Sequence, residues 1–327
     1  MGGSGATPPQ STGGPVVSEE RELLRETVAA LVEKHASPEA VRAAMESELG
    51  YDPNLWRLLC EQVGAAALVI PEEFGGAGGE LADAAVVLEE LGKALVPTPL
   101  LGTTLAEIAL LSVGRTEPLE ELAEGAKIGT VVFNPEFVIN GDIADIMIAA
   151  DGETLTQWDT FTAQPKPTMD MTRRLASVIP GATTTLGDDQ GLADTAALLM
   201  AAEQIGAASR CLDLTVAYSK DRVQFGRPIG SFQALKHRMA DLYVKVASAR
   251  AVVHDSIATP SSTSAALARY FASEALSAVT SEAVQIHGGI AITWEHDIQL
   301  YFKRAHGSAQ LLGPPREQLR RLEAEVF

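Results

Sequence analysis

Two short segments carry the most specific signal in this chain: Asp221-Arg222-Val223-Gln224-Phe225-Gly226-Arg227-Pro228 and Gln285-Ile286-His287-Gly288-Gly289. Each segment lies at the edge of a predicted helix. An arginine at such a corner can bind a pyrophosphate with the planar fork of its guanidinium, and Phe225 can stack on a ring. Taken singly, the same residues have a purely structural interpretation: Arg222 can cap its own helix with Gly226 as the C′ residue, and the paired glycines can end a helix. The two segments together, with a long helix between them, are far more specific than either alone.

The composition is that of a globular protein that does not bind nucleic acid. The 327 residues are 46% hydrophobic and 21% charged with a formal net charge of −18, whereas nucleic-acid binding needs clustered Lys and Arg. No apolar run reaches the roughly eighteen residues that a membrane span needs. Residues 1–17 are rich in Gly, Ser, Pro and Thr and are expected to be a disordered lead-in rather than a signal peptide.

The two cysteines indicate a reducing environment. Cys60 and Cys211 are far apart in the sequence and lack metal-ligand spacing, so we expect no metal site. A disulfide between them is the less favoured alternative to two free thiols. These features together predict a cytoplasmic protein.

Hydrophobic periodicity predicts a helical domain over residues 18–125. Its helices are expected to begin near Ser18, which is the candidate N-cap, and near Pro53, and to cover residues 85–95 and 100–113. The glycine-rich stretch 71–79 predicts a tight loop with positive-φ positions.

A small β domain and a long-helix bundle are expected to follow. Residues 126–187 contain short β-rich runs at 129–133, 146–149, 154–158 and 176–179, separated by turn residues. From 188 to 327 the helical pattern returns, with long segments at 192–218, 232–257 and 265–288. The predicted fold class is therefore α+β and mostly α.

At this point the chain resembles the acyl-CoA dehydrogenase family. Pro71-Glu72-Glu73-Phe74-Gly75-Gly76 resembles a loop of that family's N-terminal helical domain, and Leu88-Glu89-Glu90-Leu91-Gly92 resembles the helix after it. The segments from Asp221 to Gln233 and from Gln285 to Gly289 resemble the C-terminal helical domain. The resemblance covers nearly the whole chain from Ser18 and implies an acyl-CoA dehydrogenase fold with a truncated middle β domain.

The resemblance implies a cofactor and a set of contacts. In this family flavin adenine dinucleotide (FAD) oxidises an acyl-CoA thioester to the 2,3-enoyl-CoA, while a glutamate removes the α-proton. The family's matching motif residues reach across a subunit interface to the ADP half of the neighbour's FAD. The implied cofactor-binding residues are Arg222, Gln224, Phe225, Gln233, Gln285, Gly288 and Gly289.

Other parts of the family's site have no counterpart in the sequence. The Thr-Glu-Pro-x-x-Gly-Ser-Asp-like loop and the Trp-Ile-Thr-Asn-like strand of the β domain do not occur, and the nearest β-domain feature is the stretch from Asp170 to Leu175. The two family positions for the base fall on Leu312 and Ala196, whose side chains cannot accept a proton. The resemblance therefore implies that no catalytic base is present.

Several nearby groups are alternatives for the base. The acids are Asp194, Glu203 and Glu317, and for Glu203 a structural role in a helix interface is the favoured interpretation. His287 lies within the second motif, where packing or a flavin contact is favoured. His306 precedes Gly307-Ser308 in an expected substrate-side loop.

These losses resemble the short, degenerate subunits of actinobacterial heterotetrameric (α2β2) acyl-CoA dehydrogenases, several of which act on steroid-derived CoA esters. The resemblance implies a subunit that is inactive alone and shares FAD with a full-length partner. It also implies an acyl-CoA substrate and electron-transfer flavoprotein as the electron acceptor. Two alternatives stay open: a self-sufficient homo-oligomeric acyl-CoA dehydrogenase with an unusual base, and a flavin-free scaffold.

Overall fold

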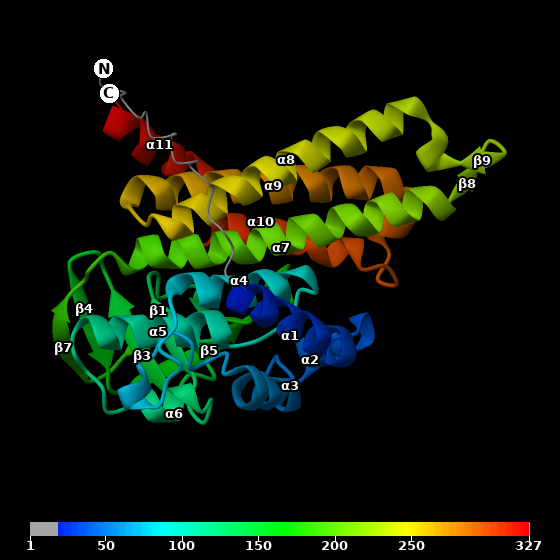
Figure 1. Ribbon diagram of the computed structural model, residues 1–327. Coiled ribbons are helices and arrows are strands. Elements are labelled where there is room, and N and C mark those ends of the chain that lie inside the picture. The colour runs from blue at the N-terminus through cyan, green and yellow to red at the C-terminus, as the bar shows by residue number, and fades with distance from the viewer. Residues whose placement is uncertain (1–18, 327) are drawn as a thin grey trace, which may run out of the picture.

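The computed structural model describes residues 19–326, and in it long helices pack across a more compact part that holds shorter helices and the strands (Figure 1). The predicted lead-in over residues 1–17 and the Ser18 N-cap lie outside the described residues. The chain is mostly helical with a small sheet region, as the sequence predicts.

The N-terminal part is helical. Its α-helices are α1 (Glu19–His35), α2 (Pro38–Glu46), α3 (Pro53–Leu58), α4 (Leu81–Lys93), α5 (Leu100–Ser112) and α6 (Leu119–Ala123). Helix α3 continues as a π-helical turn over Leu59–Val63, and a 3-10 turn covers Glu72–Phe74. Helix α2 was not predicted, although its start has a clear signal: Ser37 accepts a hydrogen bond from Ala40 N, and Pro38 follows it.

The glycine-rich loop has the predicted positive-φ positions. Gly75 and Gly78 have φ values of 83° and 65°. At Gly76 the reason for glycine is space, because a Cβ there would lie 1.9 Å from the carbonyl oxygen of Ile70.

The strands form two small sheets. They are β1 (Gly129–Val132), β2 (Val138–Ile139), β3 (Ile146–Ala150), β4 (Thr154–Trp158), β5 (Phe161–Lys166), β6 (Leu175–Pro180) and β7 (Thr183–Asp188). One sheet has the order β1-β3-β4-β7 and the other β2-β6-β5. Strands β2, β5 and β7 were not predicted. All three are edge strands, and edge strands are short or polar because one side faces away from the sheet.

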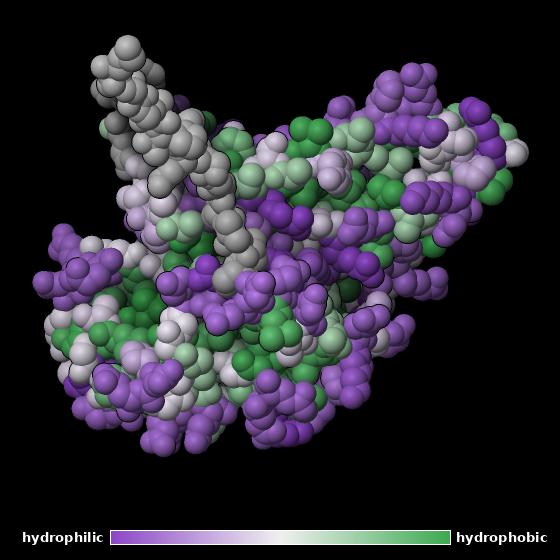
Figure 2. Space-filling view, in the orientation of Figure 1, coloured by the Kyte–Doolittle hydropathy of each residue, from purple (hydrophilic) through white to green (hydrophobic). Residues whose placement is uncertain are grey.

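The C-terminal part is a bundle of long helices. It contains α7 (Leu192–Asp221), α8 (Gln233–Ala258), α9 (Ser262–His287), α10 (Ile298–Gln310) and α11 (Pro315–Val326). A hairpin of β8 (Val223–Gln224) and β9 (Arg227–Pro228) joins α7 to α8 and projects from one end of the bundle (Figure 1). Apolar and hydrophilic residues lie side by side on this projecting end (Figure 2).

Two glycines set the close contact between α4 and α7. A Cβ on Gly92 would lie 2.2 Å from the carbonyl oxygen of Glu203, and one on Gly206 would lie 1.9 Å from that of Glu89. Each helix thus presents a glycine to the backbone of the other, so the helix axes can approach closely. This contact brings the buried carboxylates of Glu89 and Glu203 into the interface between the two halves of the chain.

Some negative findings hold for the described part of the chain. Among residues 19–326, no helix is both long and apolar enough to cross a membrane. The same residues hold no group of three or more His, Cys, Asp or Glu side chains arranged to bind a metal. Cys60 and Cys211 are buried as free thiols, so the disulfide alternative is wrong.

Candidate functional site

The tertiary structure brings the two motif segments together at one end of the helix bundle. The ring of Tyr218, near the end of α7, stacks on the imidazole of His287 with a centroid distance of 4.1 Å. The Tyr218 hydroxyl donates to the carbonyl oxygen of His287 at 3.4 Å. Beside this pair, Ile286 packs with Ile229 and Met239 in a small apolar cluster. The glycines after His287 and the β8–β9 hairpin therefore share one end of the molecule.

The first motif folds as a hairpin, which the sequence analysis did not predict. Val223 pairs with Pro228 and Gln224 with Arg227, while Phe225 and Gly226 have φ values of 52° and 78°. Positive φ at both central residues is the pattern of a type I′ turn, whose twist matches that of a hairpin. A bulky residue such as Phe225 rarely adopts positive φ, and such strained residues cluster at binding sites.

The side chains of this hairpin are directed outward. Phe225 is 92% exposed and lies edge to face with Phe232 at 6.2 Å. The Arg227 guanidinium lies 4.1 Å from the Phe232 ring centroid, a cation–π contact that stiffens the base of the hairpin. The Gln224 amide donates to the carbonyl oxygen of Val223 at 2.8 Å. Apart from these short-range contacts, the tip packs on nothing else in the described chain.

The structure shows how Arg222 ends helix α7. Its backbone N–H donates to the carbonyl oxygen of Tyr218 at 2.9 Å and it is the C-cap residue of α7, so Val223 rather than Gly226 follows the cap. Within residues 19–326 the Arg222 side chain forms no hydrogen bond or ion pair, so it does not cap the helix carbonyls. Arg222 thus caps α7 through its backbone alone, Gly226 is not the C′ residue, and the guanidinium is available to another molecule.

The other motif residues are exposed at the same end. Gln233 and Gln285 are exposed, and within the described residues their side chains have no hydrogen-bond partner. Gly288 has a φ of 66°, which explains a glycine there. At Gly289 neither backbone conformation nor space requires glycine: its φ is not in the left-handed region, and a Cβ would meet nothing within 4 Å. The described chain itself gives no reason for glycine at position 289.

His287 is held by packing. It is buried, its Nδ1 lies 2.8 Å from the carbonyl oxygen of Ala283, and its Nε2 has no partner among the described residues. Burial lowers the pKa of His287, although the bond to Ala283 acts in the opposite direction. The imidazole is thus neutral at physiological pH and serves as a stacking surface for Tyr218.

Leu312, one predicted base position, lies at a cavity at the other end of α7. This cavity of about 480 Å³ lies between α5, β1, the loop before β2, and the turn between α10 and α11. Leu312 has a φ of 57°, and its carbonyl oxygen accepts from Gln318 Nε2 at 3.1 Å. The buried guanidinium of Arg269 donates to the carbonyl oxygen of Leu311 at 2.8 Å and fixes the same turn. Ala196, the second predicted position, is fully buried in the first turns of α7.

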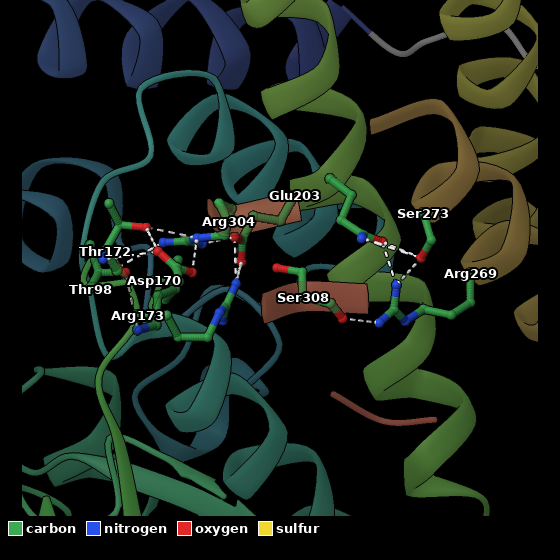
Figure 3. Close-up of polar contacts among 11 residues, drawn as sticks. Thr98, Asp170, Thr172, Arg173, Glu203, Arg269, Ser273, Arg304 and Ser308 are labelled. Atoms are coloured by element: carbon green, nitrogen blue, oxygen red, sulfur yellow. Dashed lines mark hydrogen bonds and ion pairs between the residues drawn. The ribbon is translucent and has the colours of Figure 1, made fainter. Parts of the chain in front are cut away.

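Glu203 belongs to a buried ion-pair network rather than to a cavity wall that could hold substrate (Figure 3). Its carboxylate accepts two hydrogen bonds from Arg173, at 2.5 and 2.7 Å, and another from Arg304. Burial raises the pKa of Glu203, but the two arginines outweigh burial and lower it overall. A carboxylate neutralised from two sides joins α7 to α10 and to the segment before β6, which favours the structural role.

Arg304 extends the network to the stretch from Asp170 to Leu175. Its guanidinium lies 3.0 Å from Asp170 Oδ2 and donates to Thr172 Oγ1 at 2.9 Å and to the Thr172 carbonyl oxygen at 2.7 Å. This part of the β region is therefore clamped onto α7 and α10. No role was predicted for Arg173, Arg269 and Arg304; for Arg269 the available signal was a basic residue within an otherwise apolar helical pattern.

The structure also shows the surroundings of the remaining candidate bases, Asp194, Glu317 and His306. Asp194 accepts from Arg321 at 2.5 Å, and Glu317 is exposed at the rim of the Leu312 cavity. The predicted loop position of His306 is wrong, because the residue lies within α10. There its ring is exposed, tilted against Phe302, with Nδ1 3.0 Å from the Phe302 carbonyl oxygen.

The two ends are far apart. Helix α7 has 30 residues, and at 1.5 Å per residue it is about 45 Å long. Ala193, in its first turn, lines the cavity of Leu312, whereas Arg222 directly follows its last residue. The motif residues of one chain therefore cannot act on a molecule bound in the cavity of that same chain.

Comparison with known proteins identifies the family. The acyl-CoA dehydrogenase N-terminal domain matches residues 18–122, and the acyl-CoA dehydrogenase C-terminal domain matches residues 190–326. The chain is 68% identical over 311 residues to the acyl-CoA dehydrogenase IpdE2 of Mycobacterium tuberculosis, covering 94% of this chain and 98% of that protein.

Solved structures agree with this assignment. The fold is similar to a chain of the ChsE4-ChsE5 complex from Mycobacterium tuberculosis, with a TM-score of 0.87, 25% identity, and coverage of 95% of this chain and 98% of that one. It is equally similar to the steroid ACAD Tcur3481-Tcur3483 G363A variant, with a TM-score of 0.87, 25% identity, and coverage of 94% and 98%. The resemblance drawn from the motifs is confirmed: the chain belongs to the acyl-CoA dehydrogenase family, oxidoreductases that generally use FAD.

Proposed function

We propose that this chain is the partner subunit of a heteromeric FAD-dependent acyl-CoA dehydrogenase. In an α2β2 assembly it donates contacts to the ADP half of an FAD whose ring is held by a full-length subunit. The complex oxidises an acyl-CoA thioester at its 2,3-bond, and electron-transfer flavoprotein accepts the electrons. This chain, with a truncated β domain over residues 126–187, is inactive alone.

One observation carries the proposal: the unpaired Arg222 guanidinium and the Leu312 cavity lie at opposite ends of α7. A donor set so far from its own chain's cavity fits a molecule held mainly by another chain. The residues at this end fit the ADP half of FAD. Arg222 offers a planar fork for a diphosphate, Gln224, Gln233 and Gln285 offer amides, and Phe225 offers an exposed ring.

The open space around Gly289 also fits a bound cofactor. Glycine at a position where its own chain leaves room is typical of a backbone that a ligand approaches closely. FAD, when bound, supplies the hydride acceptor of the reaction. The residues of this chain bind and orient it, while the proton is removed by a base from the partner.

The residues at the family's two base positions support the absence of the family's base in this chain, and the acids that do line the Leu312 cavity, Asp151 and Glu317, lie at neither position. Leu312 and Ala196 cannot take a proton, and Glu203 is neutralised by Arg173 and Arg304. This disfavours the self-sufficient homo-oligomer with Glu203 as its base. The unpaired Arg222 disfavours the flavin-free scaffold, which has no use for an exposed phosphate-binding arginine held beside a strained hairpin.

The substrate class follows by analogy alone. One structural relative is named as a steroid acyl-CoA dehydrogenase. This supports a steroid-derived CoA ester as the substrate of the proposed complex.

The test is co-expression with a full-length acyl-CoA dehydrogenase encoded beside this chain. We expect the chain alone to be colourless and inactive, and the complex to be yellow with about one FAD per heterodimer. Arg222→Ala should lower the flavin content and raise the Kd for FAD about tenfold or more, since a charge-assisted hydrogen bond contributes about 1.5–3 kcal/mol. Arg115→Ala, an exposed arginine in the N-terminal part, is the matched control. A yellow, active homo-oligomer would contradict the proposal, as would normal flavin content in the Arg222 variant.

A further inference from the structure

A buried carboxylate and a histidine form a pair that the proposed function does not use. Glu89 on α4 is 2% exposed, and its Oε2 lies 2.9 Å from Nε2 of His254 on α8. The contact between α4 and α7 fixes the position of Glu89, because the backbone of α4 touches Gly206 of α7 at this residue. The pair therefore sits on a rigid support formed by three helices.

The charges around Glu89 keep it ionised. The Nε of Arg250 lies 3.1 Å from Glu89 Oε1 and the Nη1 of Arg25 lies 3.6 Å from it. Burial raises the pKa of Glu89, but His254, Arg250 and Arg25 together lower it. An ionised carboxylate only accepts hydrogen bonds, so in the neutral imidazole the proton resides on Nε2 of His254 and Nδ1 carries a lone pair.

Two acceptor atoms of this pair are unused. Within residues 19–326, Nδ1 of His254 makes no hydrogen bond. Oε1 of Glu89 is buried and has ion pairs but no hydrogen bond of good geometry. Buried polar groups are normally satisfied, so the buried Oε1 of Glu89 is an acceptor that a ligand can complete. The His254 side chain is 36% exposed, so its Nδ1 is open to a molecule that enters from the cavity.

Both residues face a cavity of about 530 Å³, which is within the range of small-molecule sites. Most of its lining residues are apolar and come from α4, α7 and the end of α8 with the segment after it: Leu81, Ala82, Ala85, Val86, Ala202, Ile257, Ala258 and Pro260. The charged residues Arg21 and Arg25 of α1 and Glu80 complete the lining. Alanines on α4 and α7 leave room for a broad ligand instead of a thin chain. The cavity shares no lining residue with the Leu312 cavity or the motif end.

We propose that this cavity binds a compact apolar molecule carrying one hydroxyl group, whose O–H donates to Nδ1 of His254. Glu89 is the positioning residue, because its bond to Nε2 fixes the tautomer and the ring orientation. A hydroxyl is favoured over a carboxylate, since a carboxylate has no proton to offer to Nδ1. The two arginines that line the cavity are already paired with carboxylates, Arg21 with Glu80 and Asp83 and Arg25 with Glu89 and Glu90. The apolar walls bind the body of the ligand by burial.

The test uses two probes that differ only in the donor. The alcohol is 1-adamantanol, and 1-methoxyadamantane has the same apolar body without an O–H. Titration calorimetry with the full chain, alone and in its complex, should show that the alcohol binds about tenfold more tightly, the value of one hydrogen bond. Equal binding of the two probes, or no saturable binding of either, would overturn the proposal.

Two variants test separately how much the hydrogen bond and the apolar walls contribute to binding. His254→Phe should remove the tenfold preference and leave the methyl ether's affinity nearly unchanged. Ala258→Trp, at an exposed wall position that does not disturb the core, should weaken both probes. His237→Phe, an exposed histidine on the same helix, is the control and should change neither. Thermal unfolding checks that each variant is folded, and an undiminished alcohol preference in His254→Phe would contradict the assignment.

Discussion

Tyr218 and His287 stack at a centroid distance of 4.1 Å and an interplanar angle of 21°, and this contact holds the end of α7 against the end of α9. Arg222 lies four residues after Tyr218 and directly precedes the hairpin, and Gly288 directly follows His287. This stack brings two motifs that are distant in sequence together on one surface. The contact is therefore the structural basis of the proposed FAD-binding end.

We expect Tyr218→Ala to disorganise this end. Loss of the ring pair removes about 0.5–1.5 kcal/mol beyond burial and leaves His287 without its stacking partner. Flavin content of the complex should fall, with a modest decrease in the melting temperature of the chain. Tyr218→Phe keeps the ring and loses only the 3.4 Å hydrogen bond, so it should behave nearly as wild type. Equal flavin content in the alanine and phenylalanine variants would refute the role of the stack.

Gly289→Ala should leave the chain stable and weaken FAD binding in the complex. A methyl group at position 289 meets nothing within 4 Å in its own chain, and alanine is a better helix former than glycine. The added methyl would instead obstruct the approach of the cofactor. Absorbance of bound flavin at saturation and a thermal melt of the isolated chain measure the two effects.

The neighbouring glycine supplies the comparison. Gly288 has a φ of 66°, so Gly288→Ala should destabilise the chain itself by about 1 kcal/mol. Normal FAD affinity in Gly289→Ala would show that no ligand approaches this position.

Glu203→Gln should destabilise the fold by about 3–5 kcal/mol, because it leaves the positive charges of Arg173 and Arg304 buried without their partner. Denaturant unfolding of the isolated chain measures the change. Glu317→Gln, at an exposed position, should have no effect on stability. A stable Glu203→Gln variant whose complex had lost dehydrogenase activity would instead indicate that Glu203 is a catalytic base.

Glu107 predicts an unusual pH dependence of stability. Its carboxyl is fully buried in α5, both oxygens lack partners among the described residues, and burial raises its pKa well above 4.5. The folded state therefore retains a proton that the unfolded state releases. The resulting stability is present below the unfolded pKa and is lost as the pH rises toward the folded value.

Glu107→Met should remove this dependence. We expect the variant to be more stable than wild type at pH 8 by about 1–3 kcal/mol, the cost of an unsatisfied buried polar group. The difference in stability between Glu107→Met and wild type should be smaller at pH 5. At that pH a larger fraction of the wild-type Glu107 carboxyl is protonated, both in the folded and in the unfolded state. Urea titrations at the two pH values provide the measurement, and an identical difference at both would contradict a protonated Glu107.

The sequence predicted the long helices well because their apolar positions recur with the helical period over many turns. It failed where the local signal was weak. Strands β5 and β7 are edge strands with largely exposed side chains, and Pro165 interrupts the pattern of β5. The hairpin at Phe225 was missed because its two strands are only two residues long and its turn places a bulky residue at positive φ.

The sequence by itself determined which residue types are present for function. These are an arginine, glutamines and glycines in two motifs, and Leu312 and Ala196 at the positions where the family places its base. These are properties of residue types and do not depend on the fold. Only the tertiary structure decided where these residues lie relative to one another. The length of α7 separates Arg222 from the Leu312 cavity, and the Tyr218–His287 stack joins the two motifs. Glu203 became a structural residue because Arg173 and Arg304 come from other elements, and only packing of the whole chain brings those charges together.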